Sequence, residues 1–173
     1  VGQPRRGRGV AFQVAARESE ADVLAYFSPD GNEDPADIPK LFAQVEAGAD
    51  MAIASRMMRG AFNEEDVHWF RFRKWGNQAF TLIANLLWNR GPYVTDTING
   101  FRAVRRDAWS RMTCDADGFV IEYQMSIRAM KRGLAVAEIP TWEGPRLGGR
   151  STARSLPTGI VFLKQLWREL WIP

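Results

Sequence analysis

The chain lacks most of the features that mark secreted or membrane-spanning proteins. Its 173 residues include one cysteine, Cys114, so neither an internal disulfide nor a cysteine metal cluster can form. No apolar run approaches the roughly 20 residues that a membrane-spanning helix needs, and no secretory signal pattern occurs. We therefore expect a reducing, cytoplasmic location and no passage across a bilayer.

A strong excess of one charge sign is also absent. Lys and Arg number 23 against 20 Asp and Glu, which gives a formal net charge of +3 and a pI of 9.3. This mildly basic balance suits an anionic partner, such as a nucleotide, a lipid phosphate or nucleic acid, without choosing among them. With 46% hydrophobic and 25% charged residues, the composition predicts one globular domain with a real core and a short appendage.

Hydrophobic periodicity predicts an α/β protein. Apolar runs predict strands at 23–27, 50–54, 100–104 and 136–140, and helical spacing predicts helices at 10–20, 35–47, 67–88, 108–112, 118–131 and 156–172. Because the run at 23–27 is short and apolar throughout, we expect a strand buried on both faces. The order of strand, helix and strand from 23 to 54 predicts a right-handed parallel crossover.

The turn after the first predicted strand carries Asp30. The sequence Asp34-Pro35 then starts a helix, since Asp caps helices and Pro suits their first position. Ligands of open α/β sheets bind outside the carboxyl ends of the strands, and a carboxylate there can hold Mg²⁺ or Mn²⁺ that carries a diphosphate. The alternative is a plain turn, because Asp, Gly and Asn favour turns without any ligand.

Six short segments together resemble family 2 glycosyltransferases, in the branch of dolichyl-phosphate and undecaprenyl-phosphate sugar transferases. They lie at 28–32 (SPDGN), 53–56 (IASR), 96–102 (DTINGFR), 118–122 (GFVIE), 138–140 (EIP) and 146–151 (RLGGRS). The resemblance runs from about residue 7 to 151 and implies a GT-A fold, a mostly parallel sheet flanked by helices. It also implies an inverting transfer of a hexose from a nucleotide-diphosphate sugar by a catalytic domain at 1–154, followed by an amphipathic helix at 155–173.

Two departures from the family pattern affect the donor site. In the family a strand, helix and strand that hold the nucleotide base precede the segment matching 6–10, and no counterpart precedes Val1. We expect a fragment whose beginning is missing; the alternative is a shortened member that cannot bind nucleotide in the usual way. The family commonly has Asp-x-Asp where this chain has Ser28-Pro29-Asp30, so one of two metal-supporting carboxylates is absent. Asp30 with the diphosphate and water can still hold a metal ion.

The resemblance implies cations for the departing diphosphate. Arg56 follows the second strand of the crossover, and Arg146, Arg150 and Ser151 share a Gly-rich loop. Guanidinium groups bind phosphate oxygens well, so these residues are predicted to bind the anionic diphosphate beside the metal on Asp30. The alternative for each arginine is a solvated surface charge.

Asp96 and Glu122 are the predicted acid–base or acceptor-positioning residues, because the resemblance places their counterparts near the sugar and the acceptor. A glycan acceptor needs such a base, since its hydroxyl must lose a proton. A lipid phosphate is already ionised and needs only cations. The structural alternatives are that Asp96 caps a turn and that Glu122 faces water.

Two segments indicate a membrane surface as a partner. The stretches 69–75 and 156–172 interleave aromatic and basic residues, which suits the headgroup level of a bilayer. We expect peripheral attachment at the inner face of the membrane, beside a polyprenyl phosphate acceptor. The alternative for each stretch is a helix packed on the core.

Two other classes of function stay open. The Arg-Gly segment at 5–9 resembles nucleic-acid-binding segments, but acids nearly balance bases and no recognition motif occurs, so we expect no nucleic-acid partner. A noncatalytic relative that keeps the fold as a lipid or partner platform is the second alternative, and Ser28 favours it.

Overall fold

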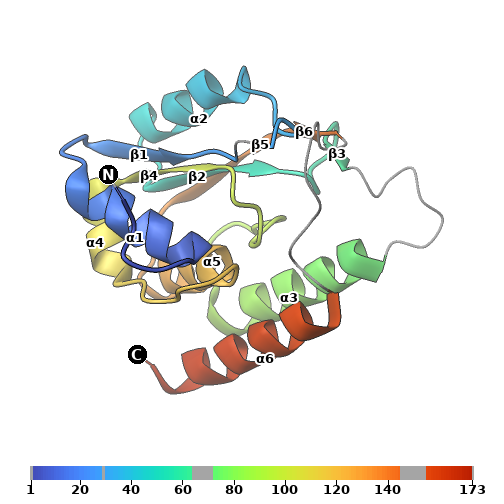
Figure 1. The fold of residues 1–173 in the computed structure, drawn as a ribbon. Helices are drawn as coiled ribbons and strands as arrows, with labels where there is room; N and C mark the ends of the chain where they lie inside the picture. Colours follow the sequence, from blue (N-terminus) through green and yellow to red (C-terminus); the bar gives the residue numbers. More distant parts are fainter. Residues whose placement is uncertain (1, 29, 64–71, 145–154, 173) are drawn as a thin grey trace.

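The structure, a computed structural model, describes residues 2–28, 30–63, 72–144 and 155–172 (Figure 1). Its elements are α1 (Arg8–Glu18), β1 (Val23–Tyr26), α2 (Asp37–Glu46), β2 (Met51–Ser55), β3 (Phe62–Asn63), α3 (Phe72–Trp88), β4 (Arg102–Arg105), α4 (Arg106–Met112), α5 (Ile121–Lys131), β5 (Val136–Pro140), β6 (Trp142–Glu143) and α6 (Ser155–Trp171). A four-stranded sheet lies between helices, and a two-stranded sheet of β3 and β6 extends from one end of it (Figure 1).

The central sheet has the strand order β1-β4-β2-β5. β2 pairs with β5 in parallel, from Met51 opposite Val136 to Ser55 opposite Pro140, whereas β4 is antiparallel to both β1 and β2. Three of the four strands therefore run in one direction, which confirms the mostly parallel sheet, and β4 occupies the place between the two strands of the predicted crossover. The carboxyl ends of β1, β2 and β5 consequently meet at one edge of the sheet.

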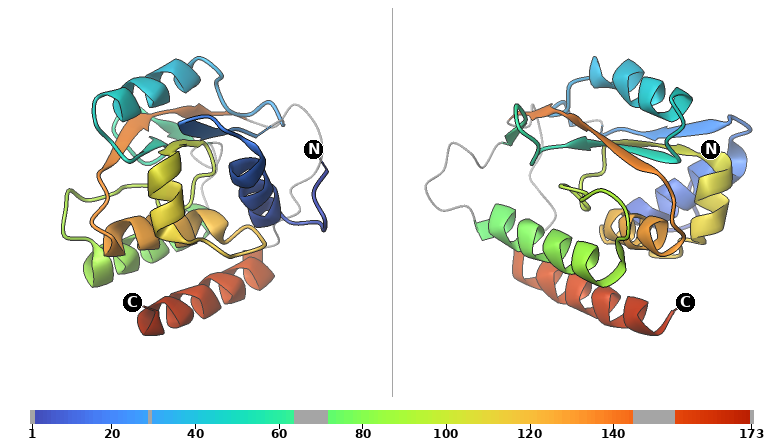
Figure 2. Two further views of the ribbon diagram at one scale, coloured as in Figure 1. Left: turned by 90° about the vertical axis from the view of Figure 1, so that its left-hand side faces the viewer. Right: turned by 180° about the vertical axis from the view of Figure 1, so that it is seen from behind.

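The sheet separates two apolar cores. Helix α2 covers one face, while α1, α4 and α5 cover the other and α3 and α6 lie beyond α5 (Figures 1 and 2). The small core under α2 consists of Leu41, Val45, Ala52, Ala54, Phe101, Ala103 and Ile139. The larger core extends from Phe12 of α1 through α5 to Phe162 of α6.

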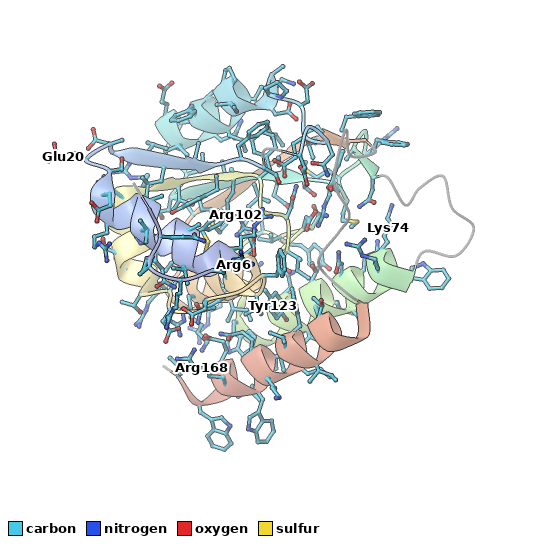
Figure 3. All side chains as sticks on the ribbon, viewed as in Figure 1. Arg6, Glu20, Lys74, Arg102, Tyr123 and Arg168 are labelled. Atoms are coloured by element: carbon cyan, nitrogen blue, oxygen red, sulfur yellow. The ribbon has the colours of Figure 1, made fainter. Side chains whose placement is uncertain are left out.

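Helix α5 is the centre of the larger core, and each of its residues from 121 to 130 is buried. Helices α1, α3, α4 and α6 all contact it. Tyr123 lies where α5, α3 and α6 meet (Figure 3). Its hydroxyl donates to the Phe80 carbonyl (2.8 Å), and its ring stacks on Phe162 with 5.3 Å between centroids. Because the helix is surrounded, its buried charged residues Glu122 and Arg128 form ion pairs with Arg8 and Glu169.

The predicted elements are present with shifted ends. Helix α2 begins at Asp37 rather than at Pro35, because residues 34–37 first form a turn in which Asp34 Oδ1 accepts a hydrogen bond from the Ala36 N–H (2.9 Å). Helix α5 likewise begins three residues after the predicted start at 118. Of the long helix predicted at 67–88, the described part is α3.

The prediction that the first strand is buried on both faces is wrong. Leu24 and Tyr26 are buried, but Ala25 is exposed and Val23 is half-buried. Helix α2 packs chiefly over β2, β4 and β5, so the face of β1 that carries Ala25 stays open. Among the described strands, β1 is an edge strand.

Helix α6, predicted from its periodicity, packs one face against α3 and α5. On that face Phe162 is buried, and the fully buried Glu169 accepts hydrogen bonds from Arg128 Nε (3.0 Å) and Lys131 Nζ (2.9 Å). Most outward residues are apolar and exposed (Ile160, Val161, Leu163, Trp167, Leu170 and Trp171), and the basic residues Lys164 and Arg168 are exposed among them. None of the helices in the described ranges is long and apolar enough to cross a membrane.

Candidate functional site

Four loops meet at the edge where the parallel strands end. Three follow β1, β2 and β5, and the fourth precedes β4. Backbone hydrogen bonds join them: the Gly144 N–H donates to the Asn32 carbonyl, the Thr141 N–H to Ser55, and the Ala54 N–H to Phe101, each at 3.0 Å. The edge is therefore held together by the main chain as well as by side chains.

Arg56 and Asp96 form a buried, two-pronged ion pair at this edge. Arg56 Nε donates to Asp96 Oδ2 (2.8 Å) and Arg56 Nη2 to Oδ1 (3.1 Å), and the Arg56 backbone N–H also donates to Oδ2 (3.2 Å). The side chains are only 13% and 1% exposed. Parallel N–H···O bonds give guanidinium–carboxylate pairs their strength and fix their geometry. The structure thus brings together two residues that the sequence assigned to separate roles.

Burial and pairing act in opposite directions on both groups. Burial by itself raises the pKa of Asp96, but the charge and hydrogen bonds of Arg56 outweigh it and lower that pKa below its ordinary value. Burial by itself lowers the pKa of Arg56, but Asp96 and Glu143 outweigh it and raise that pKa. Both groups therefore stay charged at neutral pH, and Asp96 is a weak base.

A tight turn presents Asp96, and Glu138 of β5 anchors that turn. Asp96 Oδ1 accepts a hydrogen bond from the Asn99 N–H (3.0 Å) inside the turn. Glu138 accepts from the backbone N–H groups of Thr95 (2.8 Å) and Asp96 (2.9 Å). Asp96 therefore caps the turn, as the structural alternative proposed, and binds Arg56 with the same carboxylate.

Glu143 of β6 holds Arg56 from the other side. Its Oε2 accepts from Arg56 Nη1 (3.2 Å), and its Oε1 accepts from Asn32 Nδ2 (2.9 Å) in the loop after β1. The sequence analysis missed Glu143, because β6 is only two residues long and shows no periodicity. Glu143 also lies between the segments that carry the family resemblance, so no signal in the sequence marked it.

Asp30 lies in a turn whose next residue, Gly31, has a φ of 75°, which favours glycine. Its Oδ1 atom is buried. Two residues beyond that glycine, Glu33 turns back and accepts a hydrogen bond from the Ser28 N–H (2.7 Å). Burial, with the charges of Glu143 and Asp30, raises the pKa of Glu33 to about 7. A second carboxylate, not identified from the sequence, therefore reaches the position at which Ser28 replaces an acid of the family motif.

Carboxylates outnumber cations among these side chains. Asp96 and Glu143 both pair with the guanidinium of Arg56, and the charges of Glu143 and Asp30 add to the effect of burial in raising the pKa of Glu33. A divalent cation relieves such an excess. Within the described ranges, however, no three ligating side chains gather to hold a metal ion alone. The residues therefore fit a cation that also binds ligand oxygens, such as those of a diphosphate, and water.

Glu122 lies behind the Asp96 turn, at the start of α5. Its side chain is 3% exposed and forms an ion pair with Arg8 of α1, so the alternative that it faces water is wrong. Burial raises the pKa of Glu122, although Arg8 and Arg102 oppose the shift. A Cβ atom at Gly100 would lie 3.0 Å from Glu122 Oε1, so the absence of a side chain at position 100 leaves room for this pair.

Three predicted donor-binding residues, Arg146, Arg150 and Ser151, lie outside the described residues. The predicted residues that the structure does describe divide into two groups. Asp30, Arg56 and Asp96 belong to the edge formed by the four loops, whereas Glu122 is a buried neighbour of the turn.

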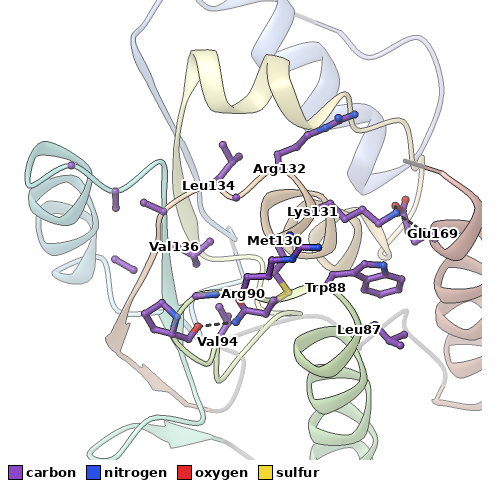
Figure 4. A pocket seen from close by; sticks show the side chains of 18 of the residues that line it. Leu87, Trp88, Arg90, Val94, Met130, Lys131, Arg132, Leu134, Val136 and Glu169 are labelled. Atoms are coloured by element: carbon purple, nitrogen blue, oxygen red, sulfur yellow. Dashed lines mark hydrogen bonds and ion pairs between the residues drawn. The ribbon is translucent and has the colours of Figure 1, made fainter.

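A separate cavity of about 1070 Å³ opens at the opposite edge of the sheet (Figure 4). The loops before β2 and β5 and the last residues of α3 line it, including Trp88, Arg90, Arg132 and Leu134. None of the predicted site residues that the structure describes lines this cavity. The candidate site is therefore the edge that carries Arg56 and Asp96.

Curated proteins similar to the chain are glycosyltransferases. The chain is 30% identical over 179 residues to glycosyltransferase AglJ of Haloferax volcanii, across 98% of the chain and 54% of that protein. It is 26% identical over 163 residues to the dolichol-phosphate mannosyltransferase of Pyrococcus furiosus, across 94% of the chain and 45% of that protein. The chain thus spans about half the length of these relatives. No family model matches it.

A solved structure shares the fold. Glucosyl-3-phosphoglycerate synthase of Mycobacterium tuberculosis, crystallised with Mn²⁺, uridine diphosphate and glucosyl-3-phosphoglycerate, superposes with a TM-score of 0.70 at 20% identity, over 98% of the chain and 57% of that protein. The α/β arrangement described above is therefore that of the GT-A glycosyltransferases. With the curated relatives and this fold in agreement, we conclude that the chain belongs to the glycosyltransferases of the GT-A fold, among whose members are dolichyl-phosphate sugar transferases.

Proposed function

We propose that this chain is the core of an enzyme that transfers a hexose from a nucleotide-diphosphate sugar to a polyprenyl phosphate, with inversion at the anomeric carbon. The observation that carries the proposal is the meeting of Arg56, Asp96 and Glu143 beside the Asp30 turn, where β1, β2 and β5 end. Ligands of open α/β sheets bind at such an edge. The activities named for the relatives support the same reaction class.

The leaving diphosphate gains negative charge as the sugar–phosphate bond breaks, so the site must supply positive charge. When bound, a divalent metal, Mg²⁺ or Mn²⁺, supplies Lewis-acid charge there, and Asp30 with Glu33 beside it would hold it. The excess of carboxylates at the edge supports this requirement, since a diphosphate needs a cation to approach them. In this proposal Arg146, Arg150 and Ser151 complete the site that binds the anionic diphosphate.

Arg56 contributes a guanidinium of fixed orientation. Its three nitrogens donate to Asp96 and Glu143, and the bond to Glu143 Oε2, at 3.2 Å, is the longest of the three side-chain bonds. We infer that a phosphate oxygen takes this nitrogen while Asp96 keeps the other two. Asp96 then acts by positioning Arg56 beside the diphosphate.

The acceptor is inferred from the two carboxylates predicted as acid–base residues, Asp96 and Glu122, because Glu33, whose pKa is about 7, is assigned above to the metal ion. A sugar hydroxyl needs a base, but Arg56 lowers the pKa of Asp96, and Glu122 is buried against Arg8. A lipid phosphate is already ionised and needs no base. The weak basicity of Asp96 and the burial of Glu122 therefore favour a polyprenyl phosphate over a glycan.

A polyprenyl acceptor requires access to a membrane surface, and we propose that α6 provides it with α3. The two helices lie side by side (Figure 2) and expose Leu82, Leu86 and Leu87 of α3 and the outward apolar face of α6. Lys164 and Arg168 lie on the same helix as the exposed Trp167 and Trp171. Tryptophans flanked by basic residues suit the headgroup level at the inner face of a membrane.

Isothermal titration calorimetry with pyrophosphate and Mn²⁺ tests the donor site. Pyrophosphate is the appropriate probe, because the edge is proposed to bind the diphosphate rather than the base. We expect binding that requires Mn²⁺ and that weakens roughly tenfold or more in Asp30→Asn. The control Asp22→Asn alters an exposed aspartate before β1, at the other end of that strand, and should bind as the unmodified chain does.

An unmodified chain that gives no heat with pyrophosphate or any nucleoside diphosphate contradicts the enzymatic proposal. Such a result would favour a noncatalytic platform with the glycosyltransferase fold.

Flotation with anionic phospholipid vesicles tests the membrane surface separately. The unmodified chain should float, and the double variant Trp167→Ala, Trp171→Ala should remain at the bottom. Trp142→Ala removes a tryptophan that is similarly exposed but lies on β6, so it should float. If the unmodified chain does not float, the membrane surface is refuted while the donor site still stands.

A further inference from the structure

Arg102, the first residue of β4, is a buried charge that binds backbone carbonyls and forms no ion pair with a carboxylate of the described residues. Its relative exposure is 0%, and none of the described carboxylates lies within ion-pair distance of it. It lies between the sheet and α5 (Figure 3). Burial lowers the pKa of Arg102 to about 10, although the more distant charges of Glu122 and Asp96 oppose the shift. The reaction proposed above does not use this residue.

The guanidinium of Arg102 is bound mainly by carbonyl oxygens of two separate elements. Nε donates to the Asn99 carbonyl (2.9 Å), and Nη2 donates to the same oxygen. Nη1 donates to the Glu122 carbonyl (3.1 Å) and to Ser126 Oγ (3.3 Å), both on α5. Arg102 therefore connects the turn before β4 to the central helix of the larger core.

The same turn carries Asp96. With the Asn99 carbonyl held by Arg102, the Asn99 N–H on the other side of the residue donates to Asp96 Oδ1 (3.0 Å). Asn99 Nδ2 donates to the Ala54 carbonyl on β2, and Ser126 Oγ donates to the Thr97 carbonyl (2.8 Å). The turn is thus fixed from β2, from α5 and from Arg102.

We propose that Arg102 is a positioning residue for the candidate site, which holds the turn so that the Asp96 carboxylate meets Arg56 in the two-pronged arrangement. It acts through Asn99 and contacts neither substrate nor metal. The positioning role concerns the structure of the ion pair alone, and its importance for catalysis rests on the function proposed above.

The chemistry of the guanidinium explains why an arginine occupies this position. An unpaired buried charge is costly, so an apolar residue would ordinarily suit a fully buried site better. A guanidinium is planar and offers five N–H donors, which lets one side chain serve carbonyls on two elements at once. A lysine has a single nitrogen at the end of a flexible stem, so it cannot hold both the turn and α5 in one geometry.

Nuclear magnetic resonance of the arginine Nε–H groups tests the proposal in the full chain. The Nε–H of Arg56 is bonded to Asp96 and buried, so it should exchange slowly with water, and Arg56→Lys identifies its signal by removing it. In Arg102→Lys we expect that signal to shift and its exchange to accelerate roughly tenfold or more. An unchanged Arg56 signal in a folded Arg102→Lys chain overturns the proposal.

Arg128→Lys is the matched control. Arg128 is also buried and also donates to backbone carbonyls, those of Met112 and Thr113, but it serves α6 and not the turn. Its substitution should lower stability while the Arg56 signal stays unchanged. If the two lysine variants change the Arg56 signal equally, Arg102 has a general structural role and the proposal fails.

A second measurement needs no variant and covers the case in which Arg102→Lys does not fold. If Arg102 holds the turn, the Nε–H groups of Arg102 and Arg56 and the Asn99 amide should exchange through one opening event with one free energy. Three different opening free energies overturn the proposal. Since neither measurement involves pyrophosphate, failure here is distinct from failure of the donor-site titration.

Discussion

Glu33 is a carboxyl group whose surroundings bring its titration close to neutral pH. Its pKa rises from an ordinary 4.5 to about 7, chiefly through burial and also through Glu143 and Asp30. Between these two pH values the folded chain keeps a proton that the unfolded chain has released. The folded state is therefore stabilised by proton uptake at low pH, and this contribution is lost as the pH rises from 4.5 to about 7.

Glu33→Gln removes this dependence, because glutamine carries no charge and can still accept the hydrogen bond from the Ser28 N–H. We expect the variant to be more stable than the unmodified chain at pH 8 by about 1–3 kcal/mol and equally stable at pH 4. Urea denaturation at both pH values measures the difference. Glu46→Gln, on the exposed face of α2, should change the free energy of unfolding by less than about 0.5 kcal/mol at either pH.

Asp96 should contribute much more to stability than an exposed aspartate in a similar pair. Asp96→Asn leaves Arg56 buried with Glu143 as its remaining acid, so we expect a loss of about 3 kcal/mol at pH 7. Because the pKa of Asp96 is lowered, its contribution is complete above the ordinary value of 3.8 and is lost as the pH falls below that value.

The control is Asp107→Asn, which breaks the exposed Arg105–Asp107 pair and should cost less than about 1 kcal/mol. Chemical denaturation at pH 7 compares the two variants. Equal losses in the free energy of unfolding would show that burial does not increase the contribution of the Arg56–Asp96 pair to stability.

Individual site residues were predictable from the sequence, but their partners were not. Asp30, Arg56 and Asp96 stand in short segments that follow apolar runs or match a family motif, so each could be named singly. That Asp96 binds Arg56 depends on the turn held by Glu138 and Arg102, and a turn of this kind has no periodicity. Glu33 and Glu143 were missed for the same reason, since their roles arise only when separate loops meet.

At the scale of elements, α6 illustrates how a helix can be amphipathic in an unusual sense. Its inward face combines Phe162 with a buried carboxylate, and its outward face is mainly apolar, with Lys164 and Arg168 as its basic residues. Phe162→Ala should cost about 3–5 kcal/mol, because it empties the space between Tyr123 and Phe80. Thermal or urea unfolding measures this loss.

Leu163→Ala, one residue further along, is the control for that prediction. Leu163 is 57% exposed, so its truncation should change stability by no more than about 0.5 kcal/mol. If both variants lose the same stability, the orientation of α6 described above is incorrect.

The order of helices and strands could be predicted, but the pairing of strands could not. Periodicity and composition located β1, β2, β4 and β5 within two residues of their observed ends, although β4 begins and ends with arginine and β5 contains Glu138. They contained no information on direction, so the antiparallel β4 between β1 and β2 was not foreseen. Strands β3 and β6, at two residues each, are too short for any pattern.

At the scale of the whole molecule, α5 links the parts into one unit. It contacts four other helices, and its side of the sheet carries the larger core. We therefore expect unfolding to be a single cooperative transition, with far-ultraviolet circular dichroism and tryptophan fluorescence giving the same urea midpoint. The six tryptophans within the described residues suit this comparison, because they lie on α3, α4, β6 and α6. A separate early transition in fluorescence alone would indicate that α6 detaches first.

The buried carboxylate of Glu169 has a consequence for how α6 can turn. A helix held only by apolar contacts can rotate about its own axis and pack a different set of apolar residues against the core. Because Glu169 pairs with both Arg128 and Lys131, rotation by even one residue, about 100°, would leave these three charges without their ion-pair partners. One acid thereby sets the rotational phase of the last helix and fixes the direction in which Trp167 and Trp171 project.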